Sequence, residues 1–432
     1  MPAGHLGLST GVGLVVANMI GAGVLLSAGF MVQEMSAGVL LLAWVLGIFL
    51  AICGTLAYGA LARVSGRSGG EYRYLRDYMH PVFGCLAGAG SLVLGFAAPI
   101  AVDALAIGAY ARALGLDLDG RIVGTFVVLG MAGLHASGFR ASDRTQNGMV
   151  AIKILMILLF AAIGLLLGSH QWPSWSPPQA SDGFPTEAFF ASQYWIAFAM
   201  TGWNAAIYAA SEFREPRRDV PRAMMIGCVG VGVVYLVINW IFVANLEPEN
   251  ARVVFDYDQT RITLGHAIME KLAGPSGGAA MSLLIIFAFL AAISAMTLVG
   301  PRVYAEMAAD GYLPSSLAAK EGKPPALSIL LQSALAVGLL WTHTILEAIA
   351  SVGALLMASS ALTCLAVFVV HRRADLPRVS LGSRVAAAVY ALAMAWCLYS
   401  GRTIFGEQIA WMAGLILLLA IAFVMRQQSR AA

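Results

Sequence analysis

The sequence contains few charged residues. Only 11% of its 432 residues are Asp, Glu, Lys or Arg, whereas soluble domains carry about 25%. A water-soluble globule of this length needs a charged surface that 26 basic and 23 acidic side chains cannot provide. A disordered chain is excluded because 59% of the residues are hydrophobic. The mean hydropathy of +0.80 therefore favours a polytopic membrane protein.

The sequence also lacks the short motifs of common enzyme classes. It has no CxxC pair, HExxH or P-loop, which argues against a redox or zinc site and against ATP-driven pumping by this chain. Its seven histidines are scattered, and its five cysteines lie in apolar runs, where we expect core residues. The net charge of +3 is too small to indicate a nucleic-acid partner. We expect no enzymatic activity, cofactor or metal.

What the chain does contain is a series of apolar stretches. Because about 20 apolar residues span a bilayer as a helix, we predict an all-α membrane protein with about twelve transmembrane helices. They lie at 6–30, 37–62, 82–111, 122–137, 148–168, 188–212, 223–245, 276–304, 326–343, 346–370, 384–400 and 408–425. Of the 26 Lys and Arg residues, 19 fall on one side and six on the other. The positive-inside rule then predicts a cytoplasmic (inner) membrane protein with both termini in the cytoplasm.

Two predicted spans are interrupted in the middle. The first interruption is Ile20-Gly21-Ala22-Gly23, and the second is Thr201-Gly202-Trp203-Asn204. Close packing of helices through small residues explains either one alone. The two positions correspond, however, if residues 6–168 and 188–370 are two five-helix repeats, the second inverted, followed by two further helices at 384–425. Paired breaks in inverted repeats are typical of the substrate site of a secondary transporter.

The backbone groups freed at such breaks favour a particular ligand. The N–H groups of Gly21, Ala22 and Gly23 attract a carboxylate, because they open a helix. Carbonyl groups at 18–20 and 199–201 accept hydrogen bonds from an ammonium group. An α-amino acid carries both groups side by side, so we predict an amino-acid-like substrate. Next to the second break, Trp203 and Asn204 are expected to shape the pocket for the substrate's side chain. The full set of predicted binding residues is Ile20, Gly21, Ala22, Gly23, Ala199, Met200, Thr201, Gly202, Trp203 and Asn204.

Four segments resemble a bacterial permease of the amino acid–polyamine–organocation (APC) superfamily. They are ANMIGAGVLLSAG (17–29), ALARVSGRSGGEYRYLRDYMHP (60–81), FAMTGWNAAIYAASEFREPRRDVPRAM (198–224) and SAMTLVGPRVYAEMAADGYLP (294–314). The resemblance implies the inverted 5+5 helix fold of the leucine-transporter type, alternating access, and amino acid or amine substrates. Two departures from the pattern of this superfamily weaken the prediction of the substrate. Ala22 stands where the family commonly has a hydroxyl residue, and Met200 and Thr201 precede Gly202 where an aromatic and an acidic or small residue are common.

Two charged residues lie inside predicted spans. Lys153 either extends its ammonium group to the membrane interface or keeps it buried among the helices. Some sodium-independent members of the superfamily are similar in having a lysine here, near the first break, and the resemblance favours the buried role. The amine then either titrates or remains a structural cation, with Ser294 and Thr297 as expected neighbours. Asp103 is costly in a membrane; it either takes part in substrate or proton binding or pairs with a polar neighbour.

Together these features predict a sodium-independent secondary transporter of amino acids or related amines, driven by proton symport. Exchange of one amino acid for another is the alternative, and a substrate-sensing membrane protein without transport is a remote one. The lipid bilayer, the substrate and protons are the expected partners. The animal light-chain relatives pair with a glycoprotein through a cysteine after the third span. The corresponding loop here, 115–121, has no cysteine, so no covalently linked heavy chain is expected.

Overall fold

The computed structural model describes residues 6–137, 139–173, 175, 183–246, 263–318 and 325–407, with four single residues beyond them: Ala410, Trp411, Gly414 and Leu418. Within these residues all regular secondary structure is helical, apart from one isolated β-bridge between Leu6 and Phe213. The predicted all-α membrane fold is confirmed. Four of the five cysteines are buried as expected, and Cys85 is half-buried.

The described helices follow the predicted spans closely. They are α1 (Leu8–Met19), α2 (Ala22–Met31), α3 (Ala37–Ser65), α4 (Gly70–Tyr78), α5 (Pro81–Gly90), η1 (Ser91–Ala97), α6 (Ala98–Ala113), α7 (Gly120–Ser137), α8 (Phe139–Leu167), α9 (Thr186–Ala191), α10 (Gln193–Ala199), η2 (Ala205–Glu212), α11 (Pro216–Asn245), α14 (Leu264–Ala309), η3 (Ser315–Leu317), α15 (Ala326–Thr342), α16 (Ile345–Arg372), α17 (Leu381–Ser400) and η4 (Gly401–Thr403).

Eight helical segments of this part of the chain are long and apolar enough to cross a membrane, or nine if α1 and α2 form one bent span. The sixth predicted span consists of the short pieces α9, α10 and η2. The twelfth, at 408–425, lies almost wholly outside the described residues. The count of twelve and the division into two inverted repeats therefore stay predictions.

Two segments between predicted spans contain helix. α4 lies between the second and third predicted spans, and α14 begins at Leu264, well before the span predicted at 276–304. The helix is kinked at Ala273 and Gly274, where Gly274 has a φ of +72°, and Pro275 starts its second part. Proline lacks the amide hydrogen needed to continue the preceding helix, so the short helix and the predicted span meet at this kink.

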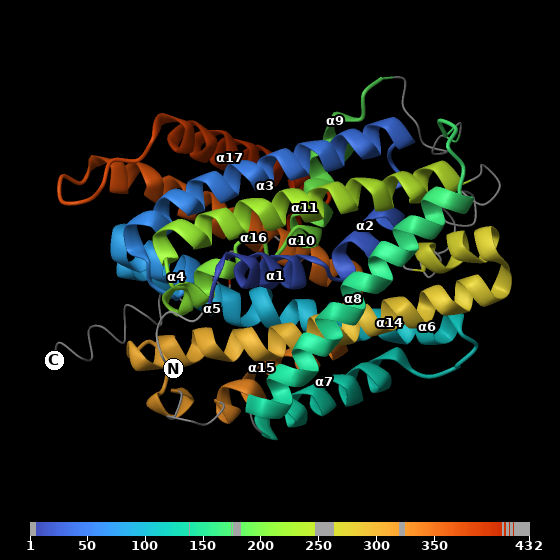
Figure 1. Cartoon of the computed structure of the whole chain (residues 1–432), viewed down its shortest axis with the longest axis horizontal. Helices are drawn as coiled ribbons and strands as arrows, with labels where there is room; N and C mark the ends of the chain where they lie inside the picture. The colour runs from blue at the N-terminus through green and yellow to red at the C-terminus, as the bar shows by residue number, and fades with distance from the viewer. Residues whose placement is uncertain are drawn as a thin grey trace.

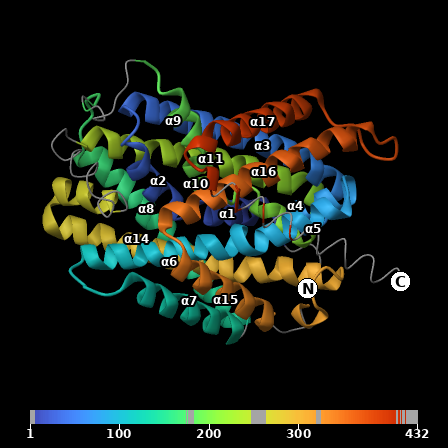
Figure 2. The same cartoon turned by 180° about the vertical axis from the view of Figure 1, so that it is seen from behind.

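The two broken spans lie in the middle of the bundle (Figures 1 and 2). The long helices α3 and α17 run along one side, and α7 and α15 run along the opposite side, with α1, α2 and α10 between them. The side chains of α10 from Gln193 to Ile196 are all buried. Because no lipid-exposed backbone can be left without hydrogen bonds in a membrane, this interior position is the place where broken helices are tolerated.

The two breaks touch each other through glycine. A Cβ atom on Gly23 would lie 2.2 Å from the Cα atom of Ala199, and one on Gly202 would lie 2.7 Å from the carbonyl carbon of Asn18. Gly202 also has a φ of +101°, which side-chain-bearing residues rarely adopt. The glycines that interrupt the two helices thus also let the two backbones approach closely.

Replacing Gly23 by alanine is expected to destabilise the fold. The added methyl group must push α2 and α10 apart, and overpacking of this kind costs about 1–3 kcal/mol. Thermal unfolding in detergent should show a lower melting temperature for Gly23→Ala. The matched control is Gly130→Ala in α7, where a Cβ atom meets nothing within 4 Å. Equal melting temperatures for the two variants would contradict the close approach.

Candidate functional site

The break in the first span separates α1 from α2. The last helical hydrogen bond of α1 runs from the Ile20 amide to the Val16 carbonyl oxygen, 3.0 Å away. α2 then starts at Ala22 after Gly21, which has no side chain to cap the helix and whose backbone lies in hydrogen-bond contact with Tyr235. The two helices form an angle of 40°. The first amide groups of α2 therefore lie in the interior at the positive end of a helix dipole.

The break in the second span is a longer interruption. α10 ends at Ala199, and the next five residues form turns before the 3-10 helix η2 begins. The Ala205 amide donates to the Gly202 carbonyl oxygen, 2.9 Å away. The Thr201 hydroxyl, just past the end of α10, donates to the Ala197 carbonyl oxygen of that helix, 3.2 Å away. Thus the predicted interruption is present at the predicted residues.

Two side chains reach the carbonyl groups freed at the end of α1. The Lys153 ammonium, whose side chain belongs to α8 and is fully buried, donates to the Ala17 carbonyl oxygen at 2.8 Å. The Tyr235 hydroxyl of α11 donates to the Met19 carbonyl oxygen at 2.5 Å. The lysine therefore does not snorkel. Tyr235 was not predicted, because a tyrosine in an apolar span carries no signal of which backbone group it reaches.

Asp103 is the charged partner of Lys153 in the interior. It is only 1% exposed, and Lys153 is the charged group that acts electrostatically on it. Its Oδ2 atom has no hydrogen-bond partner among the described residues. The hydroxyls expected beside the lysine bond elsewhere. Ser294 pairs with His135 Nε2 at 2.8 Å, and Thr297 donates to the Ile293 carbonyl oxygen of its own helix at 2.7 Å.

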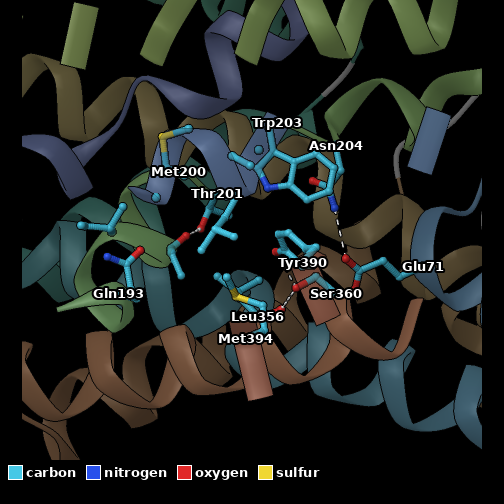
Figure 3. A pocket seen from close by; sticks show the side chains of 16 residues that line it. Glu71, Gln193, Met200, Thr201, Trp203, Asn204, Leu356, Ser360, Tyr390 and Met394 are labelled. Atoms are coloured by element: carbon cyan, nitrogen blue, oxygen red, sulfur yellow. Dashed lines mark hydrogen bonds between the residues drawn. The ribbon is translucent and has the colours of Figure 1, made fainter. Parts of the chain in front are cut away.

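A cavity borders the second break on the side facing α3, α16 and α17. Figure 3 shows Gln193 and Glu71 at its opposite ends. The predicted residues Met200, Thr201, Gly202, Trp203 and Asn204 all line it, whereas Ile20, Gly21, Ala22 and Gly23 do not. Four of its polar lining residues were not predicted as site residues: Glu71, Gln193, Ser360 and Tyr390. The cavity thus combines apolar walls with a few polar groups, as small-molecule sites commonly do.

Glu71 is the charged residue of this cavity. It lies in the first turn of α4 and is only 6% exposed. One carboxylate oxygen accepts from the Tyr58 hydroxyl at 2.6 Å and from the Asn204 side-chain amide at 3.2 Å. Burial raises the pKa of this carboxyl, and hydrogen bonds from Tyr58, Ser359 and Asn204 oppose the rise. The segment was predicted to be a cytoplasmic connection, which hid this residue.

Ionic and aromatic contacts pack the end of the bundle at which α4 lies. Arg76 contacts Asp310, whose Oδ2 atom also accepts from the Tyr72 hydroxyl at 2.8 Å. Arg73 approaches Glu306, with 3.7 Å between nitrogen and oxygen. These contacts hold α4 against the end of α14.

Comparisons with known proteins give a consistent result. The amino acid permease family matches residues 6–425. The human large neutral amino acids transporter small subunit 2 is 26% identical over 331 residues, which are 73% of this chain and 59% of the relative. The human Asc-type amino acid transporter 1 is 25% identical over 335 residues, 73% of this chain and 61% of the relative. The chain thus spans about three fifths of the length of these curated relatives.

The buried pair of Lys153 and Asp103 predicts a specific stability pattern. Lys153→Met removes the cation that acts electrostatically on Asp103, and a buried carboxylate left without a balancing charge is destabilising. The melting temperature of this variant should fall well below that of the wild type. Adding Asp103→Asn should recover part of the loss, because no buried charge is then left alone. If the double variant melts no higher than Lys153→Met, the two groups do not form a pair.

Proposed function

The chain belongs to the amino acid permease family, and on this basis we propose that it is a sodium-independent secondary transporter that carries amino acids across the membrane by alternating access, driven by proton symport. The observation that carries the proposal is the contact of two broken helices in the interior. Gly23 lies against Ala199, and Gly202 lies against Asn18. Broken helices at membrane depth are a means of binding a small charged ligand with backbone groups.

The start of α2 supports a carboxylate site. The amides of Gly21, Ala22 and Gly23 open a helix whose N-cap residue, Gly21, has no side chain, so an anion there gains hydrogen bonds and a favourable dipole. We place the substrate's ammonium group at free carbonyl groups of residues 18–20 and 199–201. The Met19 carbonyl already accepts from Tyr235, which leaves its second lone pair for a ligand. Beside the break, Trp203 and Asn204 form the wall of the side-chain pocket.

We propose that Lys153 is a fixed cation of the first break. Its ammonium group donates to the Ala17 carbonyl oxygen, an oxygen of the kind that a sodium ion would need as a ligand. Asp103 balances the charge within the interior. This arrangement explains how the end of α1 is held in place without a bound metal ion, and it supports transport that does not depend on sodium.

The test is uptake by the purified full-length protein in proteoliposomes. Radiolabelled leucine, phenylalanine, alanine, serine and arginine are offered with an inward proton gradient and without sodium. Accumulation driven by the gradient supports proton symport. Uptake only into vesicles preloaded with an amino acid supports exchange. Failure of both assays would contradict transport of these amino acids. The predicted inner-membrane location and the absence of a cysteine-linked partner subunit stay predictions.

Replacing Gly21 by alanine separates substrate binding from folding. A Cβ atom on Gly21 meets nothing closer than 3.9 Å, so the variant should melt like the wild type. The same methyl group lies beside the amides proposed for the carboxylate and should raise the KM for uptake at least tenfold. Gly130→Ala, a glycine on α7 away from the breaks, should leave the KM unchanged. A wild-type KM in Gly21→Ala would argue against a carboxylate at this position.

A further inference from the structure

Among the residues that the structure describes, Glu71 differs from the buried Asp103 in that no cation acts on its carboxylate. Its carboxylate accepts hydrogen bonds from Tyr58 on α3, from Ser359 on α16 and from Asn204. Its charge also acts on three further groups packed nearby, which are Tyr208 on η2, Cys364 on α16 and Tyr390 on α17. None of these side chains carries a positive charge. Asp103, in contrast, has Lys153. A buried carboxylate without a counter-charge is costly, so binding a proton is the way in which Glu71 loses its charge.

The cations of α4 itself are engaged elsewhere. Arg73 and Arg76 lie on the same helix as Glu71 but contact Glu306 and Asp310 at the end of α14. Glu71 instead hydrogen bonds with Tyr58 and Asn204, both neutral. The helix therefore separates its charges between two places. The arginines form ion pairs with the end of α14. The carboxyl group lines the cavity next to the second break.

We propose that Glu71 is the proton-binding site of this transporter: its carboxylate takes one proton from water on one side of the membrane and releases it on the other. The proposal rests on the proposed function and adds the group that carries the coupled ion. A proton binds a carboxylate oxygen and later leaves it, so no other reactant is needed. Lys153 then has no need to titrate, because Asp103 already balances its charge.

The contact with Asn204 links this proton to the substrate site. The Asn204 amide donates to the carboxylate at 3.2 Å and directly follows Trp203 in the interrupted segment. A neutral carboxyl group is a weaker acceptor than a carboxylate. Protonation therefore loosens the hold of α4 on the second break, and ionisation tightens it. In this way one proton biases the position of the segment that we propose to bind substrate.

The test compares Glu71→Gln with the wild type in proteoliposomes that contain a pH-sensitive dye. Glutamine keeps a side-chain oxygen that accepts from Tyr58 and Asn204 but cannot take up a proton. The variant should still exchange internal for external labelled amino acid at a rate within about twofold of wild type. Accumulation driven by the proton gradient and substrate-dependent acidification of the lumen should both be lost. Glu215→Gln is the control, because Glu215 is exposed and pairs only with Arg218.

Other outcomes overturn the proposal in distinguishable ways. Gradient-driven accumulation by Glu71→Gln at the wild-type level shows that another group carries the proton. A selective loss of arginine uptake with intact coupling for leucine shows that Glu71 instead binds cationic side chains. Wild-type protein that exchanges amino acids but never follows the proton gradient refutes proton binding here and leaves amino acid transport intact. If the wild-type protein neither exchanges nor accumulates any of these amino acids, the proposed function itself is refuted.

A second variant keeps the test decisive if Glu71→Gln does not fold. The Tyr58 hydroxyl donates to the carboxylate at 2.6 Å and so stabilises its charged form. In Tyr58→Phe the carboxyl should hold its proton to higher pH. In the wild type, we expect uptake without a proton gradient to fall as the pH rises, because Glu71 loses its proton. In Tyr58→Phe this fall should occur at a pH about one unit higher. An unchanged pH profile in this variant would overturn the assignment, since a merely structural tyrosine would not move it.

Discussion

The arrangement depends on one constraint, which is that backbone groups freed inside a membrane protein must find partners. Two helices are broken at the centre of this bundle, and water and lipid cannot satisfy their ends there. The structure meets the constraint in two ways: the two breaks pack closely against each other, and side chains donate hydrogen bonds to freed carbonyl groups. Gly23 and Gly202 bring the two breaks together, and Lys153 and Tyr235 donate to carbonyl groups at the end of α1. At the start of α2, Gly21 has no side chain and its backbone lies in hydrogen-bond contact with Tyr235, so the amides of Ala22 and Gly23 are the ones best suited to an anionic group.

The buried charges follow from the same constraint. A lysine that donates to a backbone carbonyl inside the bundle needs a balancing charge, and Asp103 supplies it. In the described part of the chain, the hydrogen-bond donors to Glu71 are the neutral side chains of Tyr58, Ser359 and Asn204. The interior thus contains one balanced site and one unbalanced carboxyl, each beside a different break. The first is suited to hold a break in place, and the second to respond to protonation.

The sequence predicted the features that depend on a short stretch of residues. Apolar runs located the helices, and glycines in the middle of two such runs located both breaks, because glycine is the residue that a helix interior disfavours most after proline. It did not predict which side chains meet across the bundle. Ser294 pairs with His135 and not with the lysine, because such pairings depend on how α7 and α14 are rotated about their axes. Glu71 was hidden because α4 is short and rich in charge, although glutamate and two tyrosines within four residues are a sign of a half-buried helix.

The central claim is that the two breaks together bind one amino acid, and amide hydrogen exchange of the protein in lipid nanodiscs tests it most directly. Exchange is measured with and without a saturating amino acid found to be transported. The account predicts that the substrate slows exchange at residues 21–25 and at 202–206 together, with little change in α7 and α15 on the side of the bundle. Protection confined to one break, or found only at the end of the molecule near α4, would contradict it.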